Sequence, residues 1–251
     1  MNLTGNTILI TGGTSGIGRA LAEALHQRGN QVIIAGRRQA LLDEITAAHP
    51  GMRGLQLDVT EATSIDAFAV AVREQFPRLN VLFNNAGITR VEDLTAEHPD
   101  PAVSQSIIDT NIVSVLRLTT ALLPLLRRQP QATVITTSSG LAFVPRADYA
   151  TYCASKAFLH SWLQSLRFQL RASSVEVLEL TPPYVQTELG GASQALDPDA
   201  MPLAEFITEV MRILGSGTVP GGEVLVERVG ALRWAEKSGA YERVFAALNG
   251  H

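Results

Sequence analysis

Short runs of apolar and β-branched residues alternate along this chain with longer stretches in which apolar positions recur every three to four residues. The short runs are apolar throughout, which is typical of strands that are buried on both faces of a sheet. The longer stretches have the spacing of amphipathic helices. The predicted strands are Thr7–Thr11, Gln31–Ala35, Gly54–Asp58, Val81–Asn84, Thr133–Thr137, Val175–Leu180 and Glu223–Glu227. The predicted helices are Ile17–Arg28, Gln39–His49, Ser64–Phe76, Ser104–Arg127, Tyr149–Arg171 and Leu203–Leu214.

The alternation of strands and helices predicts the α/β fold class. Right-handed crossovers between parallel strands give a doubly wound, Rossmann-type parallel sheet of about seven strands with helices on both faces. No repeat or linker divides the 251 residues, so we expect one domain over residues 1–251. Residues 188–202 are rich in Gly, Ala, Ser, Asp and Pro without periodicity, and we expect them to form a substrate loop.

Composition and charge exclude several classes of partner. The net charge of −4 provides no basic field for nucleic acid, and no apolar run is close to the roughly 18 residues of a membrane helix. The five histidines lack metal-ligand spacing, so no metal is expected. The N-terminal sequence does not resemble a signal peptide, and the single Cys153 cannot form an intrachain disulfide. We therefore expect a cytoplasmic protein.

A glycine-rich turn joins the first predicted strand to the first predicted helix. Its sequence is Thr11-Gly12-Gly13-Thr14-Ser15-Gly16-Ile17-Gly18. Glycines allow a sharp turn and a close approach to a pyrophosphate, and free N–H groups at a helix start attract phosphate. Glycine can also serve turn geometry alone, so it is the strand–turn–helix context that favours a nucleotide site.

Tyr152 and Lys156 lie four residues apart in a predicted helix and therefore share one of its faces. A tyrosine pKa of about 10 is too high for a base at neutral pH, but a neighbouring ammonium favours the phenolate and lowers that pKa. The pair predicts an acid/base site, although the same spacing also occurs in ordinary surface pairs.

The motifs taken together resemble those of the short-chain dehydrogenases/reductases. In chain order they are the turn at 11–18, Asn84-Asn85-Ala86-Gly87 after the fourth strand, Asn111 in the long fourth helix, Ser139 after the fifth strand, and Tyr152 with Lys156. They occur in register over residues 7–187. Within this family, residues 138–143, 152–161 and 174–187 are most similar to the DltE-type oxidoreductases.

This resemblance implies hydride transfer between a nicotinamide and a carbonyl or alcohol carbon of a small molecule. Tyr152 would be the acid/base, and Ser139 would hold the substrate oxygen. Lys156 would also bind the nicotinamide ribose, and Asn111 would hold a water of a proton relay. Ser138 and Ser139 face opposite ways on a strand end, and the family spacing of thirteen residues to the tyrosine selects Ser139.

The end of the second predicted strand bears on the choice of nicotinamide cofactor. An acidic residue there would bind the ribose 2′-hydroxyl of NAD, and family members that prefer NAD have Asp at the position of Gly36. This chain continues instead with Arg37 and Arg38, and arginine suits bidentate phosphate binding. The two arginines could simply be solvated, and Ser15 replaces the basic residue of many NADP enzymes. NADP(H) is the expected cofactor, with NAD(H) as the alternative.

Further cofactor contacts follow from the resemblance. They are Gly12, Thr14, Ser15, Gly16, Ile17, Gly18, Asp58, Val59, Asn85, Ala86, Gly87, Tyr152, Lys156, Val185 and Thr187. A partly aromatic substrate pocket is predicted from Phe143, Tyr149, Tyr184 and Leu189, with ordinary packing as the alternative for each. Pro183 stands where the family has glycine and fixes φ beside the nicotinamide.

Two other functions compete with an NADP(H)-dependent oxidoreductase. One is an NAD-dependent alcohol or polyol dehydrogenase, and the other is a catalytically silent nucleotide-binding regulator. A regulator does not need the four catalytic residues together, which favours an enzyme. The stretches Ser104–Leu126 and Tyr152–Leu170 have more apolar positions than one packing stripe requires, which predicts a homodimer or homotetramer.

Overall fold

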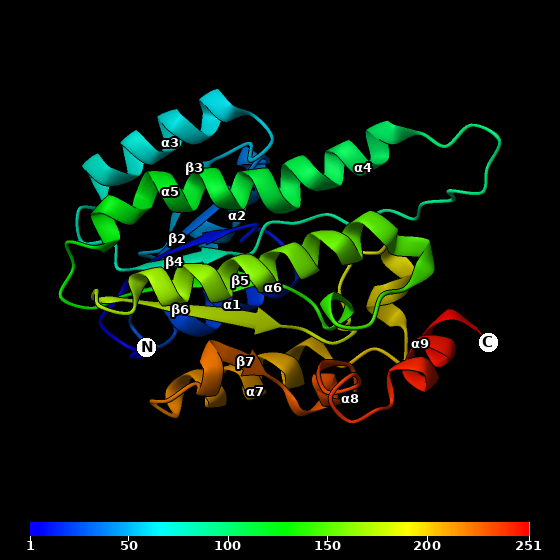
Figure 1. The fold of residues 1–251 in the computed structure, drawn as a ribbon. Helices are drawn as coiled ribbons and strands as arrows, with labels where there is room; N and C mark the ends of the chain where they lie inside the picture. Colours follow the sequence, from blue (N-terminus) through cyan, green and yellow to red (C-terminus); the bar gives the residue numbers. More distant parts are fainter. Residues whose placement is uncertain (251) are drawn as a thin grey trace.

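The computed structural model describes residues 1–250 and contains a parallel sheet of seven strands between two layers of helices (Figure 1). The strands are β1 Thr7–Thr11, β2 Gln31–Gly36, β3 Arg53–Gln56, β4 Val81–Asn84, β5 Ala132–Thr137, β6 Val175–Thr181 and β7 Glu223–Leu225. Their order in the sheet is β3-β2-β1-β4-β5-β6-β7, and every neighbouring pair is parallel. The predicted fold class is therefore confirmed.

The helices are α1 Gly16–His26, α2 Gln39–Ala48, α3 Ala62–Gln75, α4 Pro101–Ile108, α5 Ser114–Leu126, α6 Ala150–Leu170, α7 Leu203–Gly215, α8 Gly230–Arg233 and α9 Tyr241–Asn249. The central strands send alternate side chains into two apolar layers. Ile8 and Ile10 of β1 pack with α1, α2 and α7 on one face, and Leu9 packs with α3, α5 and α6 on the other. This double burial explains why the central strands are apolar at every position.

The first strand of the sheet order, β3, differs from the prediction. It was expected to be buried on both faces, but Arg53 and Gln56 are exposed. The reason is its place at the edge of the sheet, where no further strand covers it.

The long helix predicted over Ser104–Arg127 is interrupted by one π-helical turn at Asp109–Val113, which separates α4 from α5. By length and composition the helix Pro101–Leu126 is long and apolar enough on average to cross a membrane, although polar residues such as Asp109 and Arg117 interrupt its apolar positions. In the fold this helix packs against α3 and α6, and Leu118 and Leu122 belong to the core. This long apolar helix therefore belongs to the layer of helices that covers one face of the sheet.

The C-terminal part of the chain adds two short helices to the predicted elements. It forms α8 and α9, and α9 packs near the loop that precedes α6 (Figure 1). Asn249 fixes this contact, because its Oδ1 accepts a hydrogen bond from Ala147 N at 2.6 Å and its Nδ2 donates to Pro145 O at 3.2 Å.

Candidate active site

A cavity of about 980 Å³ opens at the carboxyl ends of the strands. Successive strands are added toward one edge of the sheet from β1 to β3 and toward the other edge from β4 to β7, so the strand order switches between β1 and β4. Ligands of open α/β sheets bind at such a switch point. The predicted site residues that line this cavity are Gly12, Ser15, Gly16, Ile17, Arg37, Arg38, Asn85, Ala86, Gly87, Ser139, Tyr149, Tyr152, Lys156, Tyr184, Val185, Thr187 and Leu189. Thr14, Gly18, Asp58, Val59, Asn111 and Phe143 do not line it.

The glycine-rich turn forms one end of the cavity. Gly12 and Gly16 have φ of +65° and +52°, which side-chain-bearing residues rarely adopt. Ser15, at the start of α1, makes no side-chain cap, so the first N–H groups of the helix remain available to a ligand. A Cβ on Gly12 would lie 2.9 Å from the Cα of Ala86, so only glycine lets the two loops meet. These features fit the pyrophosphate of a dinucleotide.

The end of β2 forms the adjoining wall. Arg37 and Arg38 line the cavity there, and Gly36 leaves room for Thr14, whose side chain would be 3.2 Å from an added Cβ. Asp58 lies behind this wall. Partial burial acts to raise its pKa, but hydrogen bonds from Thr60 and the charge of Arg37 bring the pKa below its ordinary value. Arg37 therefore already has one anionic neighbour, and the wall carries a net positive charge.

Helix α6 places Tyr152 and Lys156 on the opposite wall, where both are buried. Lys156 Nζ donates to Thr137 O at 2.9 Å and lies 5.6 Å from the centre of the Tyr152 ring. Ser139 follows β5; its Oγ accepts a hydrogen bond from Leu141 N at 3.1 Å and acts to lower the pKa of Tyr152. Ser138 differs, since its Oγ lies 3.2 Å from Thr181 Oγ1 inside the sheet. The structure thus brings three of the four predicted catalytic side chains together.

The ionisation of this pair differs from the prediction. Burial raises the pKa of Tyr152 to about 12, against the lowering effect of the Ser139 hydrogen bond. Burial also lowers the pKa of Lys156 to about 8, while Glu179 acts to raise it. The expected lowering of the tyrosine pKa by Lys156 is wrong for the protein alone, because burial of the phenol dominates and Lys156 is not among the groups that shift this pKa. Tyr152 is a neutral phenol at physiological pH.

Asn111, in the π-helical turn, is fully buried and lies outside the cavity wall. Its Oδ1 accepts from Ile88 N at 2.9 Å, and its Nδ2 donates to Ile88 O at 3.0 Å and to Ser155 Oγ at 3.1 Å. Ser155 Oγ in turn donates to Tyr152 O at 2.7 Å. Asn111 thus ties the loop after β4 to the catalytic helix, and its role in holding a water stays a prediction.

The prediction that Phe143 lines the substrate pocket is wrong. A 3-10 turn at Gly140–Ala142 directs it away from the cavity, and its ring packs edge-on against His160 with centroids 4.8 Å apart. Tyr184 lines the cavity as expected, and its hydroxyl donates to Asp197 at 3.0 Å. The predicted substrate loop contains a 3-10 turn at Ala192–Leu196, so it has more regular structure than its composition indicates.

Several lining residues were missed by sequence reasoning. They include Arg90, Leu141, Arg146, Leu203, Leu232 and Leu248, whereas Ser193 and Gln194 lie in the predicted substrate loop. Leu232 and Leu248 come from α8 and α9, which were not linked to a site from the sequence. Only the tertiary contacts of Asn249 reveal that α9 faces the substrate side.

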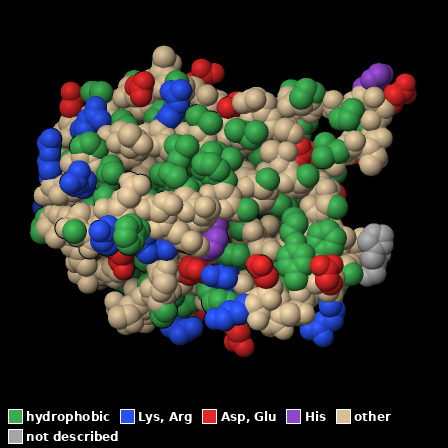
Figure 2. Space-filling view, in the orientation of Figure 1, with side chains coloured by type: hydrophobic (Ala, Val, Ile, Leu, Met, Phe, Trp, Pro, Cys, Tyr) green, Lys and Arg blue, Asp and Glu red, His purple; other side chains and the backbone are tan. Residues whose placement is uncertain are grey.

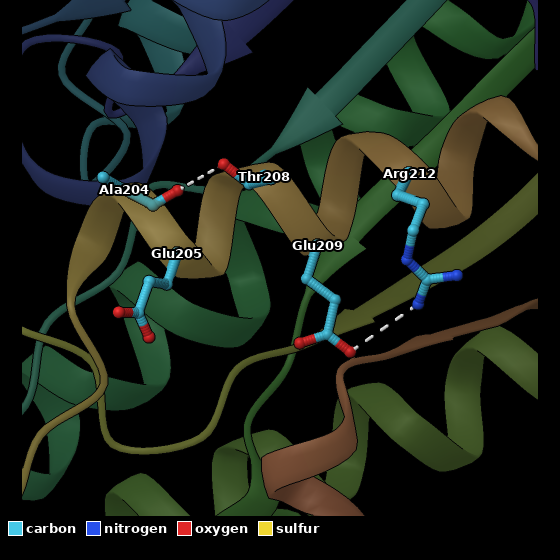
Figure 3. Close-up of a pocket in the computed structure, with 5 residues that line it drawn as sticks. All are labelled: Ala204, Glu205, Thr208, Glu209 and Arg212. Carbon is cyan, nitrogen blue, oxygen red and sulfur yellow. Dashed lines mark hydrogen bonds and ion pairs between the residues drawn. The ribbon is translucent and has the colours of Figure 1, made fainter.

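A second hollow lies on the surface of α7 (Figure 3). Its polar side chains are engaged with their surroundings. Arg212 lies 3.9 Å from Glu209, Thr208 donates to Ala204 O at 2.8 Å, and Glu209 accepts from Glu227 N at 2.8 Å. Glu205 also lines it. The acid/base residues described above line the first cavity, which is therefore the candidate active site.

Comparisons with known proteins agree with this geometry. The family model for short chain dehydrogenases matches residues 6–196, and the chain belongs to this family of oxidoreductases. It is 39% identical to the uncharacterized oxidoreductase DltE of Bacillus subtilis (strain 168), over 99% of this chain and 98% of the relative. It is 33% identical to the 3-oxoacyl-acyl-carrier-protein reductase FabG of Escherichia coli (strain K12), over 79% and 80%. The resemblance found in the motifs is confirmed.

A solved structure gives the same fold. A short chain dehydrogenase from Burkholderia cenocepacia J2315, crystallised in complex with NADP, superposes with a TM-score of 0.81 at 25% sequence identity. The match covers 98% of both chains.

Proposed function

We propose that this protein is an NADP(H)-dependent oxidoreductase that interconverts a small-molecule carbonyl and the corresponding alcohol, with Tyr152 as the acid/base. The observation that carries the proposal is the buried group of Tyr152, Ser139 and Lys156 on the wall of a cavity whose other end is the glycine-rich turn. A bound nicotinamide would supply or accept the hydride. The residues of this chain would bind, orient and move the proton.

In the direction of reduction, the Tyr152 hydroxyl would donate its proton to the oxygen of the developing alcohol. Its high pKa does not prevent this step, because an aliphatic alkoxide is more basic than a phenolate. The Ser139 hydroxyl would hold the same oxygen, and the ammonium of Lys156 would stabilise the phenolate that forms. In the direction of oxidation the same groups would act in reverse, with Tyr152 accepting the proton.

The preference for NADP(H) over NAD(H) is supported by Arg37, Arg38 and the absence of a carboxylate at Gly36. We expect Arg37→Ala to weaken NADPH by about 1.5–3 kcal/mol, the range of a hydrogen bond to a charged group, and to leave NADH almost unchanged. Fluorescence titration of both cofactors measures this. Arg28→Ala, at the far end of α1, is the matched control. Equal kcat/KM with both cofactors in the wild type would contradict the preference.

We also propose that the chain forms a homodimer or homotetramer through α5 and α6. Figure 2 shows hydrophobic side chains gathered over α5 and toward α6, and Phe158 and Phe168 of α6 are 41% and 66% exposed. Exposed apolar patches of this kind usually mark interfaces.

Light scattering across a dilution series is expected to give a multiple of 26.9 kDa. Phe158→Asp should shift the mass toward that of one chain, because it places a charge in the patch. A wild-type mass near 26.9 kDa at micromolar concentration would rule out the assembly. The cytoplasmic location and the absence of a nucleic-acid partner stay predictions.

A further inference from the structure

A fully buried carboxylate lies in the sheet beneath α6. Glu179 of β6 is opposite Thr136 of β5 and Glu223 of β7 in the strand register. Its Oε2 lies 2.8 Å from His160 Nδ1, whereas its Oε1 is buried and has no hydrogen-bond partner within residues 1–250. A carboxylate in an apolar interior is costly unless a partner balances its charge. The cavity residues described above give Glu179 no role.

The tautomer of His160 follows from its neighbours. Gln164 Nε2 lies 2.7 Å from His160 Nε2, and an amide N–H can only donate. His160 Nε2 is therefore the acceptor, and Nδ1–H donates to Glu179. The side chain of His160 is 18% exposed, so this hydrogen bond joins the buried carboxylate to the outer side of α6.

The other charged groups around Glu179 are engaged elsewhere. Arg233 of α8 donates to both carboxylate oxygens of Glu223, at 2.6 and 2.9 Å. Arg167 of α6 donates to the backbone oxygens of Val177 and Gly222. Arg233 also feels the charge of Glu179, which acts to raise its pKa, but its guanidinium is bound to Glu223. Lys156 and His160, both of α6, are the groups near the carboxylate that have no other carboxylate partner in the part of the chain that the structure describes.

Lys156 is a buried cation that has no ion-pair partner over residues 1–250. It precedes His160 by one helical turn and so lies on the same face of α6. Its buried ammonium donates to the neutral carbonyl of Thr137, and no carboxylate among the described residues is within ion-pair distance. Burial lowers its pKa to about 8, and the opposing influence that raises this pKa comes from Glu179. A buried cation needs such a counter-charge.

We propose that Glu179 is the buried counter-charge of Lys156 and that His160 holds its carboxylate in place, so that the two act as positioning residues for the ammonium. The proposal rests on the proposed function for the catalytic role of Lys156.

The alternative is a structural brace that only ties α6 to β6. The two roles differ in one measurable quantity. A brace contributes to the free energy of unfolding and leaves the ionisation of Lys156 unchanged, whereas a counter-charge determines at which pH Lys156 loses its proton.

The sequence makes this ionisation directly observable. The chain has two lysines, Lys156 and the exposed Lys237, so lysine labelled with ¹³C at Cε gives two side-chain NMR signals. In the wild type, Lys156 is expected to titrate near pH 8. In Glu179→Gln the ammonium loses its counter-charge, so the midpoint should fall by about one pH unit or more. Lys237 is the internal control, and Glu176→Gln, on the same strand, is the matched variant that should change neither signal.

An unchanged Lys156 midpoint in folded Glu179→Gln would overturn the counter-charge. Should this variant not fold, Glu179→Leu tests the same point, since an apolar side chain suits these surroundings. The role of His160 is tested by the melting temperatures of His160→Leu, Glu179→Leu and the double variant. Losses that are shared support the pair, and additive losses overturn it. The NMR readout needs no turnover, so a wild type that does not oxidise NADPH would contradict the proposed function alone.

Discussion

Replacing Tyr152 by phenylalanine is expected to lower kcat by about 10²- to 10⁴-fold, the contribution of a positioned general acid/base. The change removes a single hydroxyl from a buried ring, so the packing of α6 and the cavity wall remain. NADPH should still bind with nearly wild-type affinity, because the glycine-rich turn and the arginines at the end of β2 are untouched. Turnover and NADPH fluorescence, measured on the same preparation, separate the two effects.

Tyr149→Phe is the matched control for this experiment. Tyr149 lines the same cavity, but Cys153 rather than lysine follows it by one helical turn. Its loss should affect KM more than kcat, since it can contact substrate without transferring a proton. Wild-type turnover by purified Tyr152→Phe enzyme would remove the acid/base from the proposal.

Ser139→Ala is expected to reduce kcat by about 10²- to 10³-fold, as the loss of one donor to a developing oxyanion does. Ser139 lines the same cavity as Tyr152, and its hydroxyl acts to lower the pKa of that tyrosine. Its removal leaves the substrate oxygen with one positioning group instead of two. Steady-state kinetics with NADPH and a panel of ketones, aldehydes and β-ketoesters measures the loss.

The neighbouring serine provides the control. Ser138 Oγ bonds within the sheet to Thr181, so Ser138→Ala should lower the free energy of unfolding by about 1 kcal/mol and leave kcat nearly unchanged. If Ser138→Ala proved the more damaging to kcat, the assignment based on the thirteen-residue spacing would be incorrect.

The strands were predictable because hydrophobic periodicity is a local property and every observed strand lies within two residues of its predicted position. The exposure of β3 was not predictable, since the place of a strand in the sheet order depends on contacts far along the chain. The π-helical turn at Asp109–Val113 likewise has no signature in apolar spacing. It accompanies the hydrogen bonds between Asn111 and Ile88, which join two distant segments.

The proposed catalytic residues were predicted from motif spacing, whereas the pKa values of the site could not be predicted in this way. A sequence shows that Tyr152 and Lys156 are neighbours, but it does not show how much water both lose on folding. That loss raises the pKa of the tyrosine to about 12. Phe143 was misplaced for a related reason, because the direction of a side chain after a strand depends on the turn that follows.

Because α9 docks against the loop before α6, residues near the C-terminus contribute to the wall of the cavity. The match to the family model ends at residue 196, whereas Leu203, Leu232 and Leu248, which close the substrate side, all come later. The residues predicted to bind the cofactor and to transfer the proton thus all lie in the matched segment, whereas part of the cavity wall comes from the segment that follows it. Divergence in the last fifth of the chain can therefore alter substrate choice while the hydride-transfer apparatus stays the same. Chimeras exchanged after residue 196 offer a direct way to move selectivity between relatives.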